Sequence, residues 1–180
     1  MILGLDISTS ITGATVLDKD GKVIFCTAWD MRNKKYFPTL FDKSDFIKDR
    51  IWELNDMFHL EAVCIEQSLQ SFRSGFSSAK TLSTLSRFNG IVSWLCYSIL
   101  GIVPEYIAAT SARKKCDIKI PKGVKAKQVV IQYIVDNVPD VPIEYTKHGN
   151  PKPQCYDMAD SWVIARAGWT QCQQKKNFQS

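Results

Sequence analysis

Short runs of apolar and β-branched residues dominate the beginning of the chain, at residues 2–5, 13–17 and 23–25. Apolar runs of this length, bounded by turn-forming residues, are typical of buried strands. Asp20-Gly21 lies between the second and third runs and is a strong signal for a tight hairpin. The chain is therefore predicted to begin with three consecutive antiparallel strands.

From about residue 40 onward, the apolar spacing alternates between helix and strand patterns. Helical spacing predicts helices over residues 46–58, from Ser77 or Ser78 to Ile99, over 125–137 and over 155–169. Apolar runs predict strands at residues 62–66 and 103–107. The proline-punctuated stretch 139–153 is expected to be an exposed loop, and the polar tail 171–180 is expected to be frayed.

Three antiparallel strands followed by helix and strand alternation indicate an α/β protein with one mixed five-stranded sheet flanked by helices. The 180 residues are 45% hydrophobic, which is enough for one compact core. No internal repeat, low-complexity block or linker interrupts the pattern. A single domain over residues 1–180 is predicted.

Composition narrows the functional classes. No stretch approaches the roughly 20 apolar residues that a bilayer requires, and the first residues lack the basic start and long apolar run of a signal peptide. We therefore expect a cytoplasmic protein with no membrane partner. Six singly spaced cysteines and two histidines favour buried, reduced thiols over disulfides or zinc, and they leave little material for a Ser-His-Asp arrangement. Any catalysis must use carboxylates.

Four acids occupy positions that a solvated surface acid seldom takes. Asp6 and Glu66 each interrupt an apolar strand near its carboxyl end. Asp157 and Asp160 are three residues apart, which places both on one face of the last helix. Such acids are costly to bury unless a cation or a donor meets them.

Hard divalent cations take oxygen ligands and would offset this cost. Two such ions about 4 Å apart can activate a water and stabilise the transition state of phosphodiester cleavage. In the alternative interpretation each acid has a separate structural role. Asp6 would then belong to the N-terminal hairpin, Glu66 would have a basic partner, and the helical pair would act in capping.

The net charge is +5, and much of the positive charge lies in one segment, residues 113–127. Its cations are Arg113, Lys114, Lys115, Lys119, Lys122, Lys125 and Lys127, against the single acid Asp117. Such a segment indicates a polyanionic partner, although a solvated loop and helix start would show the same pattern.

Three motifs together resemble the RuvC family of Holliday junction resolvases, closest to its phage and viral members. They are Gly4-Leu5-Asp6-Ile7-Ser8, Ile65-Glu66-Gln67 and Tyr156-Asp157-Met158-Ala159-Asp160-Ser161. Their order and spacing follow the family from Met1 to about Trp169. The resemblance implies an RNase H-like fold, a homodimer that binds four-way DNA, and paired Mg²⁺-dependent nicks. For a bacteriophage or viral protein, the compartment would be the host cell cytoplasm.

The resemblance also implies roles for individual residues. The metal ligands would be Asp6, Glu66, Asp157 and Asp160, holding two Mg²⁺ ions, with Mn²⁺ as an alternative, and Lys127 would join them as a catalytic residue near the scissile phosphate. The implied DNA-binding residues are Phe72, Arg73, Phe76, Arg113, Lys114, Lys125 and Lys127. Phe72 and Phe76 would stack on unpaired bases, or else pack under their loop. The connection 116–123 departs from the bacterial pattern, which leaves the cleavage-sequence preference open.

The leading hypothesis is a Mg²⁺-dependent endodeoxyribonuclease that resolves four-way or branched DNA junctions. The same carboxylates would serve a nuclease acting on RNA-DNA hybrids or flaps, because the site alone does not choose the substrate. A non-catalytic DNA-binding module that keeps the fold is a third hypothesis. The sugar kinase-type ATPases also begin with a strand, an acid and a hairpin, but this chain is too short for their two domains.

Overall fold

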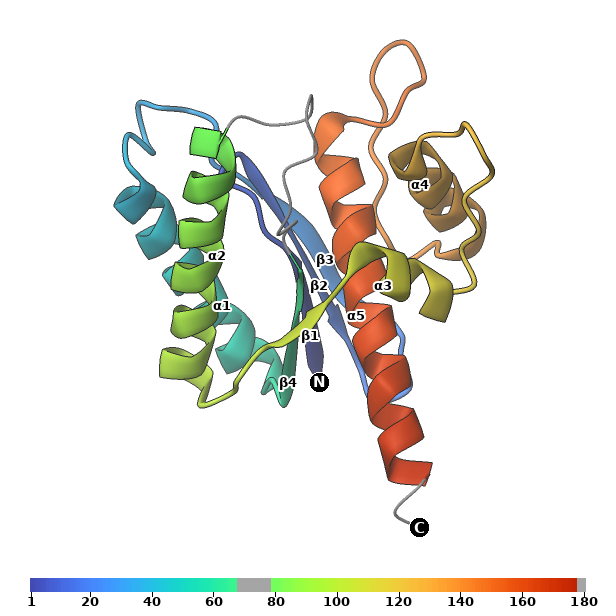
Figure 1. The fold of residues 1–180 in the computed structure, drawn as a ribbon, viewed down its shortest axis with the longest axis horizontal. Coiled ribbons are helices and arrows are strands. Elements are labelled where there is room, and N and C mark those ends of the chain that lie inside the picture. The colour runs from blue at the N-terminus through green and yellow to red at the C-terminus, as the bar shows by residue number, and fades with distance from the viewer. Residues whose placement is uncertain (68–78, 178–180) are drawn as a thin grey trace.

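The computed structural model describes residues 1–67 and 79–177. These residues form a five-stranded sheet with the order β3-β2-β1-β4-β5 (Figure 1). The strands are β1 (Ile2–Asp6), β2 (Ile11–Leu17), β3 (Val23–Asp30), β4 (Ala62–Glu66) and β5 (Glu105–Ile107). The mixed sheet predicted from the apolar pattern is confirmed. The Asp20-Gly21 hairpin is also present, with Gly21 at a φ of +79° and its N–H donating to the Asp18 carbonyl at 3.1 Å.

Strand direction determines where the ends of the strands lie. β2 runs antiparallel to both β1 and β3, whereas β1 pairs with β4, and β4 with β5, in parallel. It follows that β1, β3, β4 and β5 all run the same way. Their carboxyl ends share one end of the sheet, which we call the carboxyl edge.

Helices cover both faces of the sheet (Figure 1). One face packs against α1 (Leu40–Phe58) and α2 (Ala79–Leu100), and the other against α5 (Pro153–Asn177), with α3 (Ala109–Lys115) and α4 (Ala126–Asn137) beside it. Along β1, Leu3 and Leu5 enter the first core, whereas Ile2 belongs to the second. This alternation of side chains is the reason why a short apolar strand can be buried on both faces.

Two glycines let α5 lie directly on the sheet. A Cβ on Gly4 would lie 2.5 Å from the Ala165 backbone nitrogen, and one on Gly13 would lie 1.9 Å from the Asp157 carbonyl oxygen. A buried hydrogen bond of 2.8 Å between the Thr15 and Ser161 hydroxyls joins the same two elements. These contacts fix the height of α5 and hold its first turns at the carboxyl edge.

The structure differs from the sequence expectations mainly at helix ends. α5 begins with Pro153, whose missing N–H costs nothing in a first turn. It continues to Asn177, so residues 171–177 are helical rather than frayed. The reason is that its far end is tied to the β2–β3 turn, where Trp169 Nε1 and Gln173 Nε2 both donate to the Lys19 carbonyl.

The bounds of other helices and strands also differ from the predicted ranges. α1 begins six residues before the apolar repeat, because Thr39 and Asp42 form a reciprocal capping box. α3 was not predicted, because only Ala112 of its seven residues is buried and no apolar period marks it. β5 covers only residues 105–107, and Val103 is exposed. The predicted caps Ser77 and Ser78 lie outside the described residues.

All six cysteines are free thiols. Within the described residues, no helix combines the length and apolar character needed to cross a membrane.

Candidate active site

Asp6 and Glu66 lie side by side at the carboxyl edge. Leu5 of β1 pairs in register with Ile65 of β4, so the acid that follows in each strand ends a neighbouring parallel strand. Both acids are partly buried. The apolar strands position these two carboxylates because the strands must be buried, which leaves the acids at the point where the core ends.

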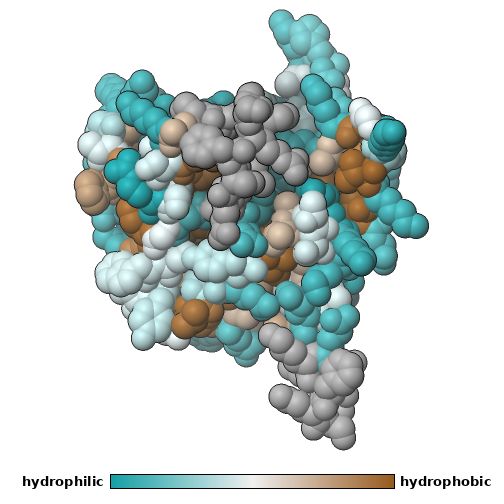
Figure 2. Space-filling view, viewed as in Figure 1, coloured by the Kyte–Doolittle hydropathy of each residue, from teal (hydrophilic) through white to brown (hydrophobic). Residues whose placement is uncertain are grey.

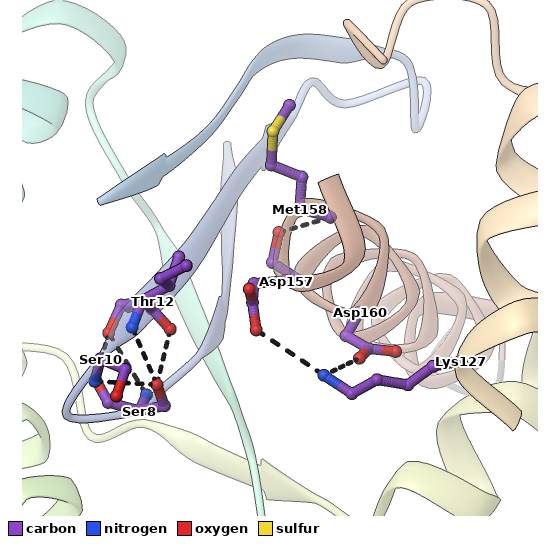
Figure 3. Close-up of polar contacts among 9 residues, drawn as sticks. Ser8, Ser10, Thr12, Lys127, Asp157, Met158 and Asp160 are labelled. Atoms are coloured by element: carbon purple, nitrogen blue, oxygen red, sulfur yellow. Dashed lines mark hydrogen bonds and ion pairs between the residues drawn. The ribbon is translucent and has the colours of Figure 1, made fainter. Parts of the chain in front are cut away.

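Asp157 and Asp160 reach the same place from the first turns of α5. Their side chains are 16% and 13% exposed. The ammonium group of Lys127, from α4, lies 3.7 Å from Asp157 Oδ1 and 3.5 Å from Asp160 Oδ2, so it points between the two carboxylates (Figure 3). We call Asp6, Glu66, Asp157 and Asp160 the carboxylate cluster.

The pKa values show that the cluster is crowded with negative charge. Burial raises the pKa of Asp6 well above its usual range, and repulsion from Glu66, Asp160 and Asp157 raises it further. Burial, together with repulsion from Asp160, raises the pKa of Glu66 to about 7. Burial also raises the pKa values of Asp157 and Asp160, against the opposing attraction of Lys127. The cluster therefore favours any added cation, including a proton.

Arg113 on α3 contributes a second positive charge. Its guanidinium lowers the pKa values of Glu66 and Asp160, against the larger effect of their burial. Arg113 also lines an open cavity of about 510 Å³ between α3 and the start of α4, together with Lys114 and Lys119. In the described part of the chain, Lys127 and Arg113 are the cations that lower these carboxyl pKa values, and their attraction does not offset the effect of burial.

The turn that follows Asp6 is closed by side-chain hydrogen bonds (Figure 3). The Ser8 hydroxyl donates to the Ile11 carbonyl at 2.8 Å and accepts from the N–H groups of Ser10 and Ile11 at 3.1 and 3.0 Å. Thr12 Oγ1 donates to the Ser8 carbonyl at 3.0 Å. Ser8 therefore holds the β1–β2 turn close to the end of β1, which fixes the backbone that leaves Asp6.

The donor set of the cluster fits a hard divalent cation, because all four groups supply carboxylate oxygens and carry unbalanced charge. As the side chains stand, no three acid, His or Cys groups among residues 1–67 and 79–177 already converge on one ion-binding point. The ammonium of Lys127 lies between Asp157 and Asp160 instead. Asp6, Glu66, Asp157 and Asp160 would hold such an ion, and the Lys127 ammonium neutralises part of the charge of two of them in its absence.

The structure brings together most of the residues that the sequence indicated. Electrostatic interactions link the four acids with Lys127 and Arg113. Lys114 lines the same cavity as Arg113. Lys125 is the exposed N-cap residue of α4. The predicted DNA-binding residues Phe72, Arg73 and Phe76 lie outside the described residues.

Sequence analysis missed Arg32. It follows β3, where it forms an ion pair with Asp30 at 2.5 Å that raises the pKa of the guanidinium, and Asp157 adds to this effect. The apolar run of this strand ends at Phe25, so the strand pattern does not indicate that residues 30–32 belong to the site. The structure continues β3 to Asp30, which pairs with Ile11 of β2 and so brings Arg32 to the carboxyl edge.

The sequence matches no protein-family model, and no curated protein matches it significantly. Solved structures do match over nearly the whole chain. Thermus thermophilus RuvC in complex with a Holliday junction substrate has a TM-score of 0.67 at 15% identity, covering 96% of this chain and 94% of that one. This chain has the RuvC fold.

A second RuvC-fold structure is the yeast mitochondrial Holliday junction resolvase Ydc2, with a TM-score of 0.63 at 15% identity, covering 98% of this chain and 80% of that one. A further structure of Thermus thermophilus RuvC has a TM-score of 0.64 at 16% identity and covers 97% and 96%. At these identities the likeness establishes the fold. The RNase H-like, five-stranded architecture expected from the motifs is thereby confirmed, with the carboxylate cluster at its carboxyl edge.

Proposed function

We propose that this protein is a Mg²⁺-dependent endonuclease that resolves four-way DNA junctions by paired nicks. The observation that carries the proposal is the carboxylate cluster, in which acids from β1, β4 and α5 meet at one edge of a RuvC-fold sheet. Structures with this fold include one bound to a Holliday junction.

Asp6, Glu66, Asp157 and Asp160 would hold the metal. When bound, two divalent ions would supply an activated water and neutralise charge on the phosphate that is cleaved. The neighbouring cations suit the same substrate. Lys127 is 60% exposed, so its ammonium can contact a phosphate while it remains within reach of the acids.

Arg113 and Lys114 extend the positive charge along the cavity beside α3, where they would hold the DNA backbone. Such phosphate contacts position the DNA without reading its sequence. The acids therefore supply the chemistry, and the basic residues supply the orientation of the strand.

Paired nicks require two active sites, and we propose a homodimer. A four-way junction offers two equivalent strands, which a two-fold symmetric dimer would match. Support comes from α2, where Trp94 and Tyr97 are 63% and 56% exposed on consecutive turns. Large exposed aromatic residues are enriched at protein interfaces.

The test is cleavage of a labelled four-way junction in Mg²⁺ by the wild type, by Asp6→Asn and by the matched control Asp56→Asn. Asp56 is exposed on α1, so its substitution changes the net charge equally but leaves the cluster intact. We expect symmetric nicks from the wild type and the control, and none from Asp6→Asn. Undiminished nicking by Asp6→Asn would refute the assignment.

The choice of substrate needs a parallel comparison. The same preparations are tested on linear duplex, flap and RNA-DNA hybrid substrates of equal length. Preference for the four-way junction is expected, whereas faster cleavage of the hybrid or the flap would refute junction resolution but retain the nuclease. No metal-dependent cleavage of any substrate would leave a DNA-binding module instead.

A further inference from the structure

The segment that follows β3 is a fixed turn with positive charge, residues 32–37, which we call the basic turn. Its entry is anchored by Met31, which is fully buried and whose N–H donates to the Ser10 carbonyl at 2.8 Å. The Asn33 carbonyl accepts from the N–H of Phe37 at 2.9 Å, and the Phe37 ring packs on Phe46 at 5.2 Å. The turn is therefore held at both ends while its middle faces solvent.

Two exposed lysines, Lys34 and Lys35, lie in this middle. A third, Lys43, comes from the first turn of α1 and donates a hydrogen bond to the Thr9 carbonyl in the β1–β2 turn. Burial lowers the pKa of Lys43, and so does its proximity to Lys34. The ammonium groups of Lys43 and Lys34 thus lie near one another beside the turn that leaves the Asp6 strand, and Lys35 adds its charge from the next position of the basic turn.

This gathering is unfavourable in the isolated protein. Lys43 and Lys34 repel one another, and the first turn of a helix already carries a positive dipole end. The nearby acids are otherwise engaged, because Asp30 pairs with Arg32 and Asp42 closes the capping box of α1. Within the described residues, none of the three lysines has a carboxylate within ion-pair distance. A polyanion would turn this repulsion into attraction.

The strand order places the basic turn across the cluster from the basic residues of segment 113–127. The basic turn follows β3 at one edge of the sheet, whereas Arg113 follows β5 at the other, and Asp6 and Glu66 lie on β1 and β4 between them. Four strand spacings of about 4.8 Å separate the two edges, or about 19 Å. This distance corresponds to between five and six base-pair steps of about 3.4 Å.

Both basic regions lie at the same end of the molecule. Figure 1 shows the segment after β3 at the end where α5 begins, and Figure 2 shows hydrophilic side chains on both sides of that end. We propose that Lys34, Lys35 and Lys43 form a second phosphate-binding rim, which holds the DNA strand on the opposite side of the scissile phosphate from Arg113 and Lys127. The inference rests on the proposed function, because it takes DNA as the ligand.

The test measures junction binding in EDTA, where no cleavage occurs, as a function of salt concentration. The double variant Lys34→Ala with Lys35→Ala is compared with Lys19→Ala with Lys22→Ala. The control pair is also exposed and has the same charge, but it lies in the β2–β3 turn at the opposite end of the sheet. Thermal melting confirms that both double variants fold.

Each lost phosphate contact lowers the slope of log K against log salt by about 0.9. For the rim variant we expect the magnitude of this slope to fall by about 1.8 and the affinity at 0.1 M salt to fall about 60-fold. For Lys43→Gln we expect the slope to fall by about half as much. The control pair should keep the wild-type slope. A rim variant whose slope equals that of the control would overturn the proposal.

Failure of the rim and failure of the proposed function give different results. If the wild type cuts junctions and the rim variant keeps its slope, the rim is wrong and the nuclease stands. If the rim variant loses slope but the wild type cuts no DNA in Mg²⁺, the rim stands as a DNA-binding surface and the nuclease is wrong.

Discussion

Glu66→Gln should make the metal-free protein more stable at neutral pH, although it removes a group that we place at the centre of function. Burial and the neighbouring acid Asp160 raise the pKa of Glu66 from 4.5 to about 7. An ionised carboxylate at this position is therefore disfavoured in the folded state relative to the unfolded chain. Glutamine keeps the shape of the side chain and removes the charge.

The magnitude follows from the two proton affinities. A pKa of about 7 instead of 4.5 corresponds to about 3 kcal/mol of lost stability above pH 7, since each tenfold change in proton affinity amounts to about 1.4 kcal/mol. The folded state binds the proton more tightly, so wild-type stability is highest below about pH 4.5 for this group and is lost as the pH rises to about 7. The advantage of Gln should shrink below about 1 kcal/mol at pH 5.

Thermal and urea unfolding in EDTA at pH 5 and pH 7.5 would measure this effect, with Asp56→Asn as the control for a lost surface charge. For a chain of this size, about 3 kcal/mol corresponds to a rise in Tm of about 6–12 °C at pH 7.5. Added Mg²⁺ should reverse the order, because the ion stabilises the wild type by mass action and binds the variant less tightly. A variant no more stable than the wild type at pH 7.5 would refute this account of the cluster.

Three other predictions follow from packing and charge. Gly13→Ala should destabilise the fold by about 1–3 kcal/mol, because its Cβ would meet the α5 backbone at 1.9 Å. Gly90→Ala, whose Cβ would lie in open space, should instead stabilise α2 by about 1 kcal/mol. Urea unfolding measures both free energies, and equal effects would contradict the close approach of Gly13 to α5. Lys127→Gln should slow single-turnover nicking by about 100-fold while leaving Tm within a few degrees; unchanged nicking would remove Lys127 from the reaction. Burial raises the pKa values of Cys96 and Cys116 to about 12, so mass spectrometry should find both thiols unalkylated by iodoacetamide at pH 8 until urea is added, and rapid native alkylation would contradict their burial.

The sequence by itself determined the elements and most of the chemistry. Each apolar run that stops at Asp6 or Glu66 predicts a buried strand and marks where that strand leaves the hydrophobic core. The two acids could therefore be placed at strand ends from the sequence alone. The spacing of Asp157 and Asp160 similarly required one face of a helix. In these cases the information is local, because strand and helix periods act over a few residues.

Only the tertiary structure decided which of the charged residues meet the cluster. Lys127 and Lys125 are two residues apart in one basic run, yet one reaches Asp160 and the other caps α4 in solvent. Arg32 and Lys43 lie outside the basic segment 113–127, and strand order brings them to the carboxyl edge. The contact of Gly13 with α5 is equally invisible in the sequence, because it depends on how closely a helix lies on the sheet.

The physical reason is that burial is encoded locally and proximity is not. Whether a residue is apolar decides whether it is buried or exposed to solvent, and apolar residues recur along the chain with the period of the strand or helix. Which two buried elements then touch depends on strand pairing and on helix packing across the whole chain. The carboxylate cluster could therefore be predicted as a set of acids, whereas the cations that surround it depend on the fold.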